Sequence, residues 1–154
     1  MLRIFVDADA CPMKDEIYRV AERYALQVTL VANSRMRIPD KGGIELVVVG
    51  EGLDVADDWI VDGAERDDIV ISADLLLAAR CLQKGAHVIG TTGQPFVDDN
   101  IGSLLALRDL HAELREAGAL RGGPPPLQKR DRFRFLQSLD AVIQRVRRES
   151  GGRG

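Results

Sequence analysis

Short apolar runs alternate along the chain with segments whose apolar residues recur every three or four positions. The runs predict five strands, at residues 2–6, 27–32, 45–49, 69–72 and 86–89. Between them, the helical spacing predicts helices at 13–24, 53–61 and 75–84. Strands that alternate with helices favour an α/β fold. We expect a three-layer sandwich whose mostly parallel central sheet has about five strands.

The last third of the chain is expected to add C-terminal helices to this sandwich. Residues 90–95 predict a loop, and 99–117 a long helix. The Gly- and Pro-rich stretch 118–130 predicts a connector. A final helix from Asp131 should bury one apolar stripe, formed by Phe135, Leu136, Leu139, Val142, Ile143 and Val146. We therefore predict a single domain over 1–150 and a frayed tail at 151–154.

The composition, with 45% hydrophobic and 29% charged residues, is typical of a globular protein. We find neither an apolar stretch that could span a membrane nor a signal peptide, and so expect a cytoplasmic protein. Charge is uneven: residues 54–74 carry eight acidic side chains and one arginine, whereas 129–149 carry seven basic and three acidic side chains. This division suits an enzyme that holds a metal ion and phosphate. It suits two solvated faces of opposite charge equally well.

Aspartates follow two of the predicted strands. Asp7 and Asp9 come at the end of the first strand, and Asp74 follows the fourth. In an open parallel sheet, ligands bind outside the carboxyl ends of the strands. Carboxylates gathered there could hold a hard cation such as Mg²⁺ or Mn²⁺. The alternative is structural, because an aspartate at a strand end also starts a turn or caps the next helix.

The predicted helix at 53–61 is acidic. Asp54, Asp58 and Asp62 are spaced by four residues, which stacks them on one helical face where like charges repel. A cation would relieve that repulsion, and we assign Asp58 to the site. Asp54 is expected to complement the helix dipole. Asp57 lies about 100° around the helix and is expected to be solvated.

Basic and nucleophilic candidates are fewer. Lys14, Arg35 and Arg37 are candidate phosphate contacts, although basic loop residues are commonly only solvated. Cys11 precedes Pro12 at a predicted helix start, where the pKa of a thiol can be lowered, but no histidine adjoins it in the sequence. The sequence shows no Ser-His-Asp triad, Walker loop or GxGxxG motif.

Several ungapped motifs together carry a family resemblance. They are DADACP (7–12), VAN (31–33), GLDVADDWIV (52–61), ISADLLLAARCLQKGAHVI (71–89), DDNI (98–101), GGPPP (122–126) and DRFRFLQSLD (131–140). With these motifs the chain resembles the YaiI/YqxD family of uncharacterised bacterial proteins. That pattern in turn is similar to the PIN-like and NYN ribonuclease folds. The resemblance implies metal carboxylates at Asp7, Asp58 and Asp74, with Asp9 beside them and Asp99 or Asn100 in a fourth position.

These features lead to the hypothesis of a metal-dependent hydrolase that cleaves phosphodiesters, with RNA as the expected partner and Mg or Mn as the expected cofactor. Asp7, Asp58 and Asp74 would be catalytic, and Asp9 and Asp99 would add metal ligands. Substrate contacts are expected from Lys14, Arg35, Arg37, Asn100 and Arg132. One alternative is a non-catalytic PIN-like module that binds RNA or protein. Another is a phosphatase that uses an aspartate nucleophile on a small substrate.

Overall fold

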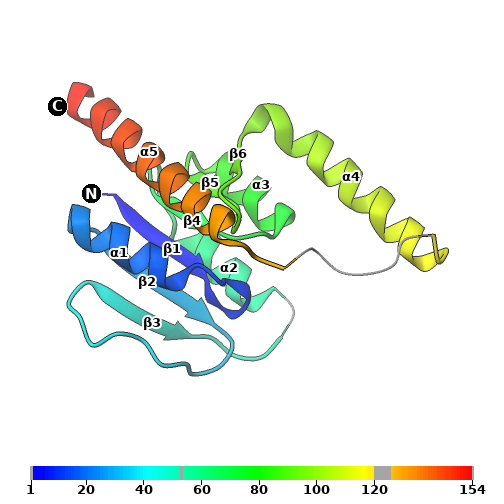
Figure 1. The fold of residues 1–154 in the computed structure, drawn as a ribbon, viewed down its shortest axis with the longest axis horizontal. Coiled ribbons are helices and arrows are strands. Elements are labelled where there is room, and N and C mark those ends of the chain that lie inside the picture. The colour runs from blue at the N-terminus through cyan, green and yellow to red at the C-terminus, as the bar shows by residue number, and fades with distance from the viewer. Residues whose placement is uncertain (1, 53, 120–125, 154) are drawn as a thin grey trace.

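The computed structural model describes residues 2–52, 54–119 and 126–153, of which the side chains beyond 149 are left out (Figure 1). Six strands form one sheet in the order β3-β2-β1-β4-β5-β6. The strands are β1 (Arg3–Asp7), β2 (Gln27–Ala32), β3 (Ile44–Val48), β4 (Ile69–Ile71), β5 (His87–Ile89) and β6 (Pro95–Phe96). The first five strands pair in parallel and correspond to the five predicted ones.

The sixth strand was not predicted, because residues 90–95 read as a loop. β6 has two residues and pairs antiparallel with β5 at the edge of the sheet. Its first residue is Pro95, which lacks a backbone N–H and is tolerated only where no partner needs that donor. A pair of residues containing proline gives no alternating pattern from which a strand could be predicted.

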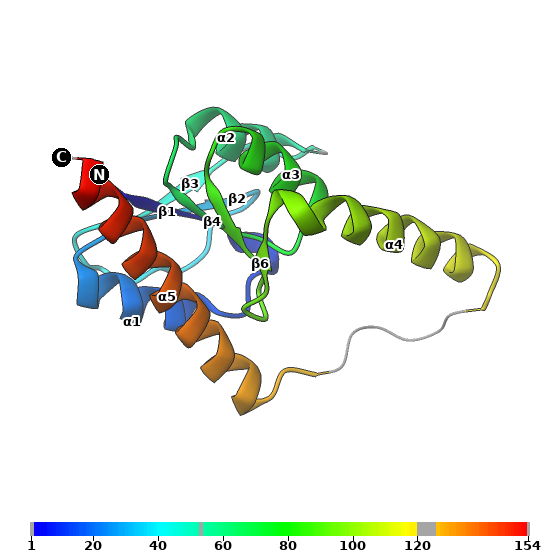
Figure 2. The same ribbon diagram turned by 90° about the horizontal axis from the view of Figure 1, so that it is seen from above.

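Helices cover both faces of the sheet, so the predicted three-layer sandwich is confirmed. They are α1 (Lys14–Tyr24), α2 (Val55–Gly63), α3 (Leu75–Gln83), α4 (Asp98–Glu116) and α5 (Lys129–Arg153), with a short 3₁₀ helix, η1 (Ala8–Ala10). Figure 2 shows α2 and α3 on one face of the sheet and α1 with α5 on the other. None of the helices in the described part of the chain has the length and apolar character to cross a membrane.

Each face of the sheet has its own core. Alternate strand residues such as Val6 and Ile71 pack with α1 and α5, including the buried side chain of Phe135. Their neighbours Phe5 and Val70 pack on the opposite face with α2 and α3. Burial on both faces explains why the strands are continuous apolar runs rather than alternating ones.

The order of the strands reverses beside β1. The chain moves outward from β1 through β2 to β3, and α2 then carries it back to β4 on the other side of β1. The carboxyl ends of β1 and β4 therefore flank a topological switch point. Ligands of open α/β sheets bind in the crevice at such a point.

The C-terminal third departs most from the sheet. α4 contacts α3 at its start and projects away from the sheet (Figures 1 and 2), and none of its residues is buried. The predicted connector, 118–130, lies partly outside the described residues. α5 begins at Lys129, two residues before the predicted Asp131, and returns to the sheet. The predicted frayed tail is helical as far as Arg153, and Gly154 lies outside the described residues.

Candidate functional site

Asp7 and Asp74 come together at the switch point. Asp7 ends β1, and Ser72 directly follows the neighbouring strand β4. The hydroxyl of Ser72 donates a hydrogen bond to Asp7 Oδ2 (3.0 Å), and the backbone N–H of Asp74 donates to that same hydroxyl (3.0 Å). Val6 lies opposite Ile71 in the register of the two strands, so the residues that follow them, Asp7 and Ser72, are neighbours at the edge of the sheet. Both strand-end aspartates are thus joined through one serine.

Asp74 also caps helix α3. Its Oδ1 accepts hydrogen bonds from the backbone N–H groups of Leu76 (2.9 Å) and Leu77 (3.1 Å), which have no partner within the helix. The structural role weighed from the sequence is therefore present. It does not exclude a second role, because each carboxylate oxygen has two lone pairs.

Asp74→Ala should lower the melting temperature of the metal-free protein by a few degrees, because loss of an N-cap costs about 1 kcal/mol. Asp74→Asn should leave it unchanged or raised, because asparagine also caps and carries no charge. Thermal unfolding monitored by circular dichroism measures both. If both variants lose the same stability, the carboxylate has a further structural partner that asparagine cannot replace.

Asp57 on α2 is the third carboxylate at this site. Its side chain is half-buried, and burial together with the charges of Asp74, Asp7 and Asp54 raises its pKa to about 6. A hydrogen bond with the side chain of Asp74 adds to the increase in this pKa. Burial and the charges of Asp74 and Asp9 likewise raise the pKa of Asp7, although the Ser72 hydroxyl opposes the change. The carboxylates of Asp7, Asp57 and Asp74 therefore interact with one another.

The structure does not bring Asp58 into this group. Asp58 is exposed, and its Oδ1 lies 2.8 Å from Nη1 of Arg80 on α3. Consecutive helical residues differ by about 100° in direction, so only one of Asp57 and Asp58 can face the sheet edge. The buried residues Ala56 and Ile60 define the inner face of α2, and Asp57 follows the first of them. That apolar spacing is the signal in the sequence that could have identified Asp57, and the expectation that Asp57 is solvated is wrong.

Asp9 has a structural partner at the same edge of the sheet. It is exposed, and its Oδ2 accepts a hydrogen bond from the backbone N–H of Asn33 after β2 (2.8 Å). The Asn33 side chain in turn donates to the carbonyl of Gly50 after β3 (3.1 Å). Asp9 thus links the segments that follow β1, β2 and β3.

The residues expected in a fourth position, Asp99 and Asn100, lie in the first turn of α4. Asn100 caps α4: its Oδ1 accepts from the backbone N–H of Val97 (2.9 Å), and its Nδ2 donates to the carbonyl of Pro95 (3.3 Å). Asp99 is exposed in the first turn. In the described part of the chain, no hydrogen bond joins either residue to the Asp7–Ser72–Asp74 network.

Two of the predicted substrate-binding cations are held by the protein itself. Lys14 donates to the carbonyl of Cys11 (3.1 Å). Arg132 on α5 donates from Nη1 to the carbonyl of Pro12 (3.2 Å) and to Oε1 of Glu16 (2.9 Å). Arg132 therefore fastens the start of α5 to the turn that follows the Asp7 segment.

The remaining candidates are two loop arginines and one cysteine. Arg35 and Arg37 are exposed in the loop after β2, where a phosphate could reach them. Cys11 is buried, and burial raises the pKa of its thiol despite the nearby Lys14. The idea of a lowered thiol pKa at this helix start is therefore wrong. A buried neutral thiol is a poor nucleophile.

The three carboxylates do not form a closed metal-ion cage. In residues 2–52, 54–119 and 126–153, no three side chains of His, Cys, Asp or Glu are close enough to hold a metal ion together. This separates the site from zinc centres, which need three or four protein ligands. Mg²⁺ makes a smaller demand, because it commonly keeps several waters and binds through one or two carboxylates and the phosphates of a substrate.

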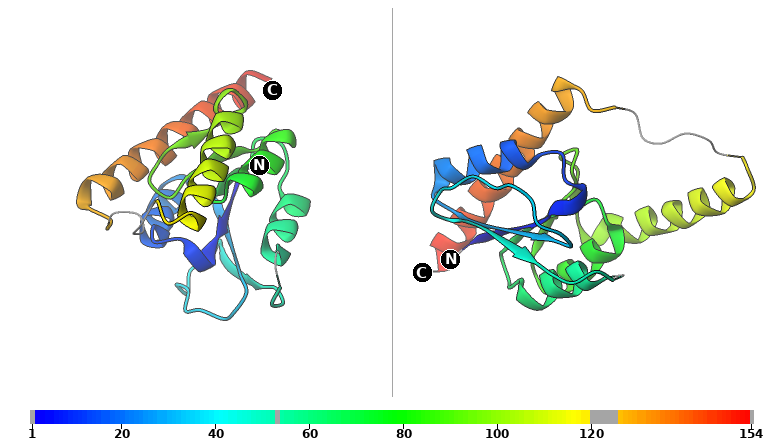
Figure 3. Two further views of the ribbon diagram at one scale, coloured as in Figure 1. Left: turned by 90° about the vertical axis from the view of Figure 1, so that its right-hand side faces the viewer. Right: turned by 90° about the horizontal axis from the view of Figure 1, so that it is seen from below.

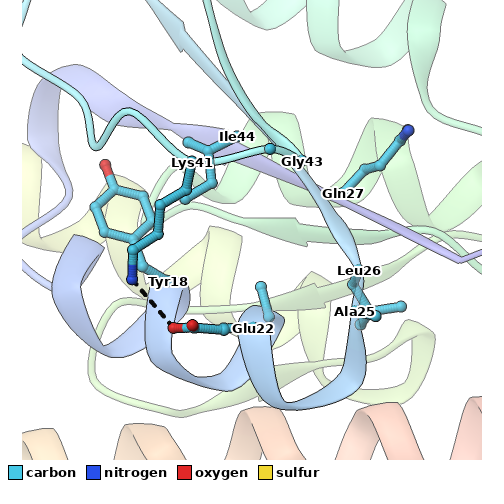
Figure 4. Close-up of a pocket in the computed structure, with 10 residues that line it drawn as sticks. Tyr18, Glu22, Ala25, Leu26, Gln27, Lys41, Gly43 and Ile44 are labelled. Atoms are coloured by element: carbon cyan, nitrogen blue, oxygen red, sulfur yellow. Dashed lines mark hydrogen bonds and ion pairs between the residues drawn. The ribbon is translucent and has the colours of Figure 1, made fainter.

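A cavity of about 500 Å³ lies at the opposite end of the sheet, between α1 and the loop before β3 (Figure 4). An ion pair between Lys41 and Glu22 (3.2 Å) spans it beside the ring of Tyr18. Gln27 and Ile44, which begin β2 and β3, also line it. It therefore lies at the amino ends of the strands, away from the edge where sheets of this kind bind ligands.

Comparison with known proteins finds a family and close relatives that match nearly the whole chain. A family model described as "Uncharacterized BCR, YaiI/YqxD family" matches residues 5–145. A "UPF0178 protein" of Nitrobacter winogradskyi is 51% identical over 152 residues, which cover 99% of this chain and 97% of that protein. A "UPF0178 protein" of Parvibaculum lavamentivorans is 53% identical over 148 residues, 96% of this chain and 97% of its own. No solved structure matches the chain significantly.

Proposed function

The chain belongs to the YaiI/YqxD family, and from the geometry of its own carboxylates we propose that it is a metal-dependent phosphodiesterase acting on RNA. One observation carries the proposal: the carboxylates of Asp7, Asp57 and Asp74 interact at the switch point between β1 and β4. Asp57 takes the place that the sequence had given to Asp58. Crowded carboxylates oppose folding, and a bound cation would relieve their repulsion.

The donor set fits Mg²⁺ or Mn²⁺. All three side chains offer carboxylate oxygens, the ligands that hard cations prefer. Asp7 and Asp74 are held in place by the Ser72 hydroxyl and by the α3 cap, so they are the residues that would bind the cation. When bound, the cation would neutralise charge on the phosphoryl oxygens and acidify an attacking water.

Asp57 has the properties of a proton acceptor. Its raised pKa of about 6 lies close to neutral pH, where a general base is most effective. It would take the proton of the attacking water at a carboxylate oxygen while Asp7 and Asp74 hold the cation. Arg35 and Arg37 would position the RNA backbone through its phosphates, without reading the base sequence.

The purified protein should cleave labelled single-stranded RNA when Mg²⁺ or Mn²⁺ is added, and EDTA should stop the cleavage. Asp7→Asn should reduce the rate by about 100-fold or more, because the cation would lose a fixed ligand. Gel analysis of the products measures the rate.

Other results would contradict this function. RNA binding without cleavage in either metal would favour the non-catalytic module. A trapped aspartyl-phosphate would favour the phosphatase. Cleavage that Asp7→Asn leaves unchanged would come from a contaminant or from another site.

A further inference from the structure

We propose that the groove between α1 and α5 binds single-stranded RNA, with one base stacked on Phe133 and the flanking phosphates on Arg19 and Arg23. The proposal rests on the function proposed above and names where the substrate strand would run beyond the carboxylates. Figure 3 shows the two helices on the same face of the sheet, where α5 crosses α1 obliquely and the two contact each other.

Phe133 is the most exposed of the large apolar side chains in the described part of the chain. It is 61% exposed, whereas Phe135, two residues further along α5, is fully buried. Phe133 borders a cavity of about 270 Å³, whose other lining residues are Arg19, Val20, Arg23, Leu136, Gln137 and Asp140. An aromatic ring left open to water beside such a hollow is a stacking platform for an unpaired base.

The charge around the groove complements a phosphate backbone. Arg19 and Arg23 are spaced by four residues on α1 and are both exposed. The first turns of α5 carry further exposed cations outside the cavity lining, namely Lys129, Arg130, Arg132 and Arg134. Arg23 has one acidic neighbour at 3.7 Å, Asp140, which is itself hydrogen-bonded by Tyr24 and Gln144. An aromatic ring among such cations is the usual composition of a surface that binds single strands without sequence preference.

The groove starts at the edge of the sheet that carries the carboxylates. Arg132 fastens the first turns of α5 to Pro12 and Glu16, just after the segment led by Asp7. The turn after β5 also packs closely against α5. A Cβ added at Gly93 in this turn would lie only 3.0 Å from the backbone oxygen of Arg134. A strand held at the switch point can therefore continue over this edge into the groove.

Single-stranded RNA is favoured over a protein partner by the balance of charge. A protein surface docked on Phe133 would have to place acidic side chains against both Arg19 and Arg23, whereas RNA supplies one negative charge at every nucleotide. Base-paired RNA would not expose a base face to Phe133. The groove therefore fits an unpaired strand.

The test measures binding of a fluorescent single-stranded RNA of about a dozen nucleotides by anisotropy. EDTA is present, so that cleavage plays no part. Phe133→Ala should weaken binding by about 10-fold, and Phe133→Trp should restore it, because stacking needs only an aromatic face. Arg19→Glu should weaken binding by a similar factor and flatten its dependence on salt. Arg108→Glu, which removes an exposed arginine from α4, is the matched control and should stay within about twofold of the unaltered protein.

The outcomes separate this proposal from the nuclease function. Binding that depends on Phe133 without metal-dependent cleavage would uphold the groove and overturn the nuclease. Metal-dependent cleavage, together with RNA binding that Phe133→Ala leaves unchanged, would uphold the nuclease and overturn the groove. Equal affinity for duplex RNA would overturn stacking, and tighter binding of single-stranded DNA would overturn RNA as the ligand. Because Phe133 is exposed, Phe133→Ala should keep the melting temperature of the unaltered protein, so a loss of binding cannot be attributed to unfolding.

Discussion

Asp57→Asn is expected to stabilise the metal-free protein and, at the same time, to reduce RNA cleavage by about 100-fold or more. Both effects have one origin, the carboxylate held beside Asp7 and Asp74. Replacing it with a neutral amide removes the repulsion. It also removes the group proposed to accept the proton of the attacking water. A residue that costs stability and supports activity is a common feature of active sites.

The stabilisation should depend on pH. The pKa of Asp57 is raised from 3.8 in the unfolded chain to about 6 in the folded one. As pH rises through this window the unfolded state loses the proton first, so folding loses stability, and above about 6 the full penalty remains. Because the side chain is only half-buried, solvent screening reduces the penalty to about 1 kcal/mol. The melting temperature of Asp57→Asn should therefore exceed that of the unaltered protein by about 3 °C near pH 8 and match it near pH 3.5.

Asp58→Asn is the matched control, one residue away on the same helix. It breaks an exposed ion pair with Arg80, which contributes about 0–1 kcal/mol, so the melting temperature should stay or fall slightly. Cleavage should remain within about threefold, because Asp58 does not face the other carboxylates. Thermal unfolding and cleavage rates of the two variants show which of Asp57 and Asp58 is the catalytic carboxylate. Loss of cleavage in Asp58→Asn alone would return the catalytic role to Asp58.

The sequence was sufficient for the five parallel strands of the sheet and for two of the three carboxylates, Asp7 and Asp74. Strands buried on both faces appear in the sequence as unbroken apolar runs. An aspartate that follows such a run is therefore expected at the strand end. Asp7 is the last residue of β1, and Asp74 caps the helix that follows β4. It was harder to predict which side of α2 faces the sheet. Charge spacing alone favoured Asp58, whereas burial of Ala56 and Ile60 turns Asp57 inward.

Partners that are distant along the chain could not be predicted. Arg132 meets Glu16 from 116 residues away, and Asp9 after β1 meets the backbone of Asn33 after the neighbouring strand β2. Both residues were assigned to ligands because an isolated charge in a sequence shows no partner. Only the docking of α5 and the order of the strands reveal that each of them already holds two segments of the fold together.

Phe135→Ala should destabilise the protein more than any other single change considered, by about 3–5 kcal/mol. The Phe135 side chain is fully buried in the core between α5 and the sheet, with Leu139 and Ile143 on the same stripe. Removing the ring would leave a cavity that the core can close only in part, because the turn at Gly93 already lies against the backbone of α5.

Urea and thermal unfolding should show this loss as a fall in melting temperature of roughly 10 °C. Phe133→Ala is the matched control, since it removes the same ring from the exposed side of the same helix and should cost less than about 0.5 kcal/mol. Equal stability of the two variants would mean that α5 does not dock through its apolar stripe. In that case neither the groove beside α1 nor the ion pair between Arg132 and Glu16 could be maintained, because both depend on that contact.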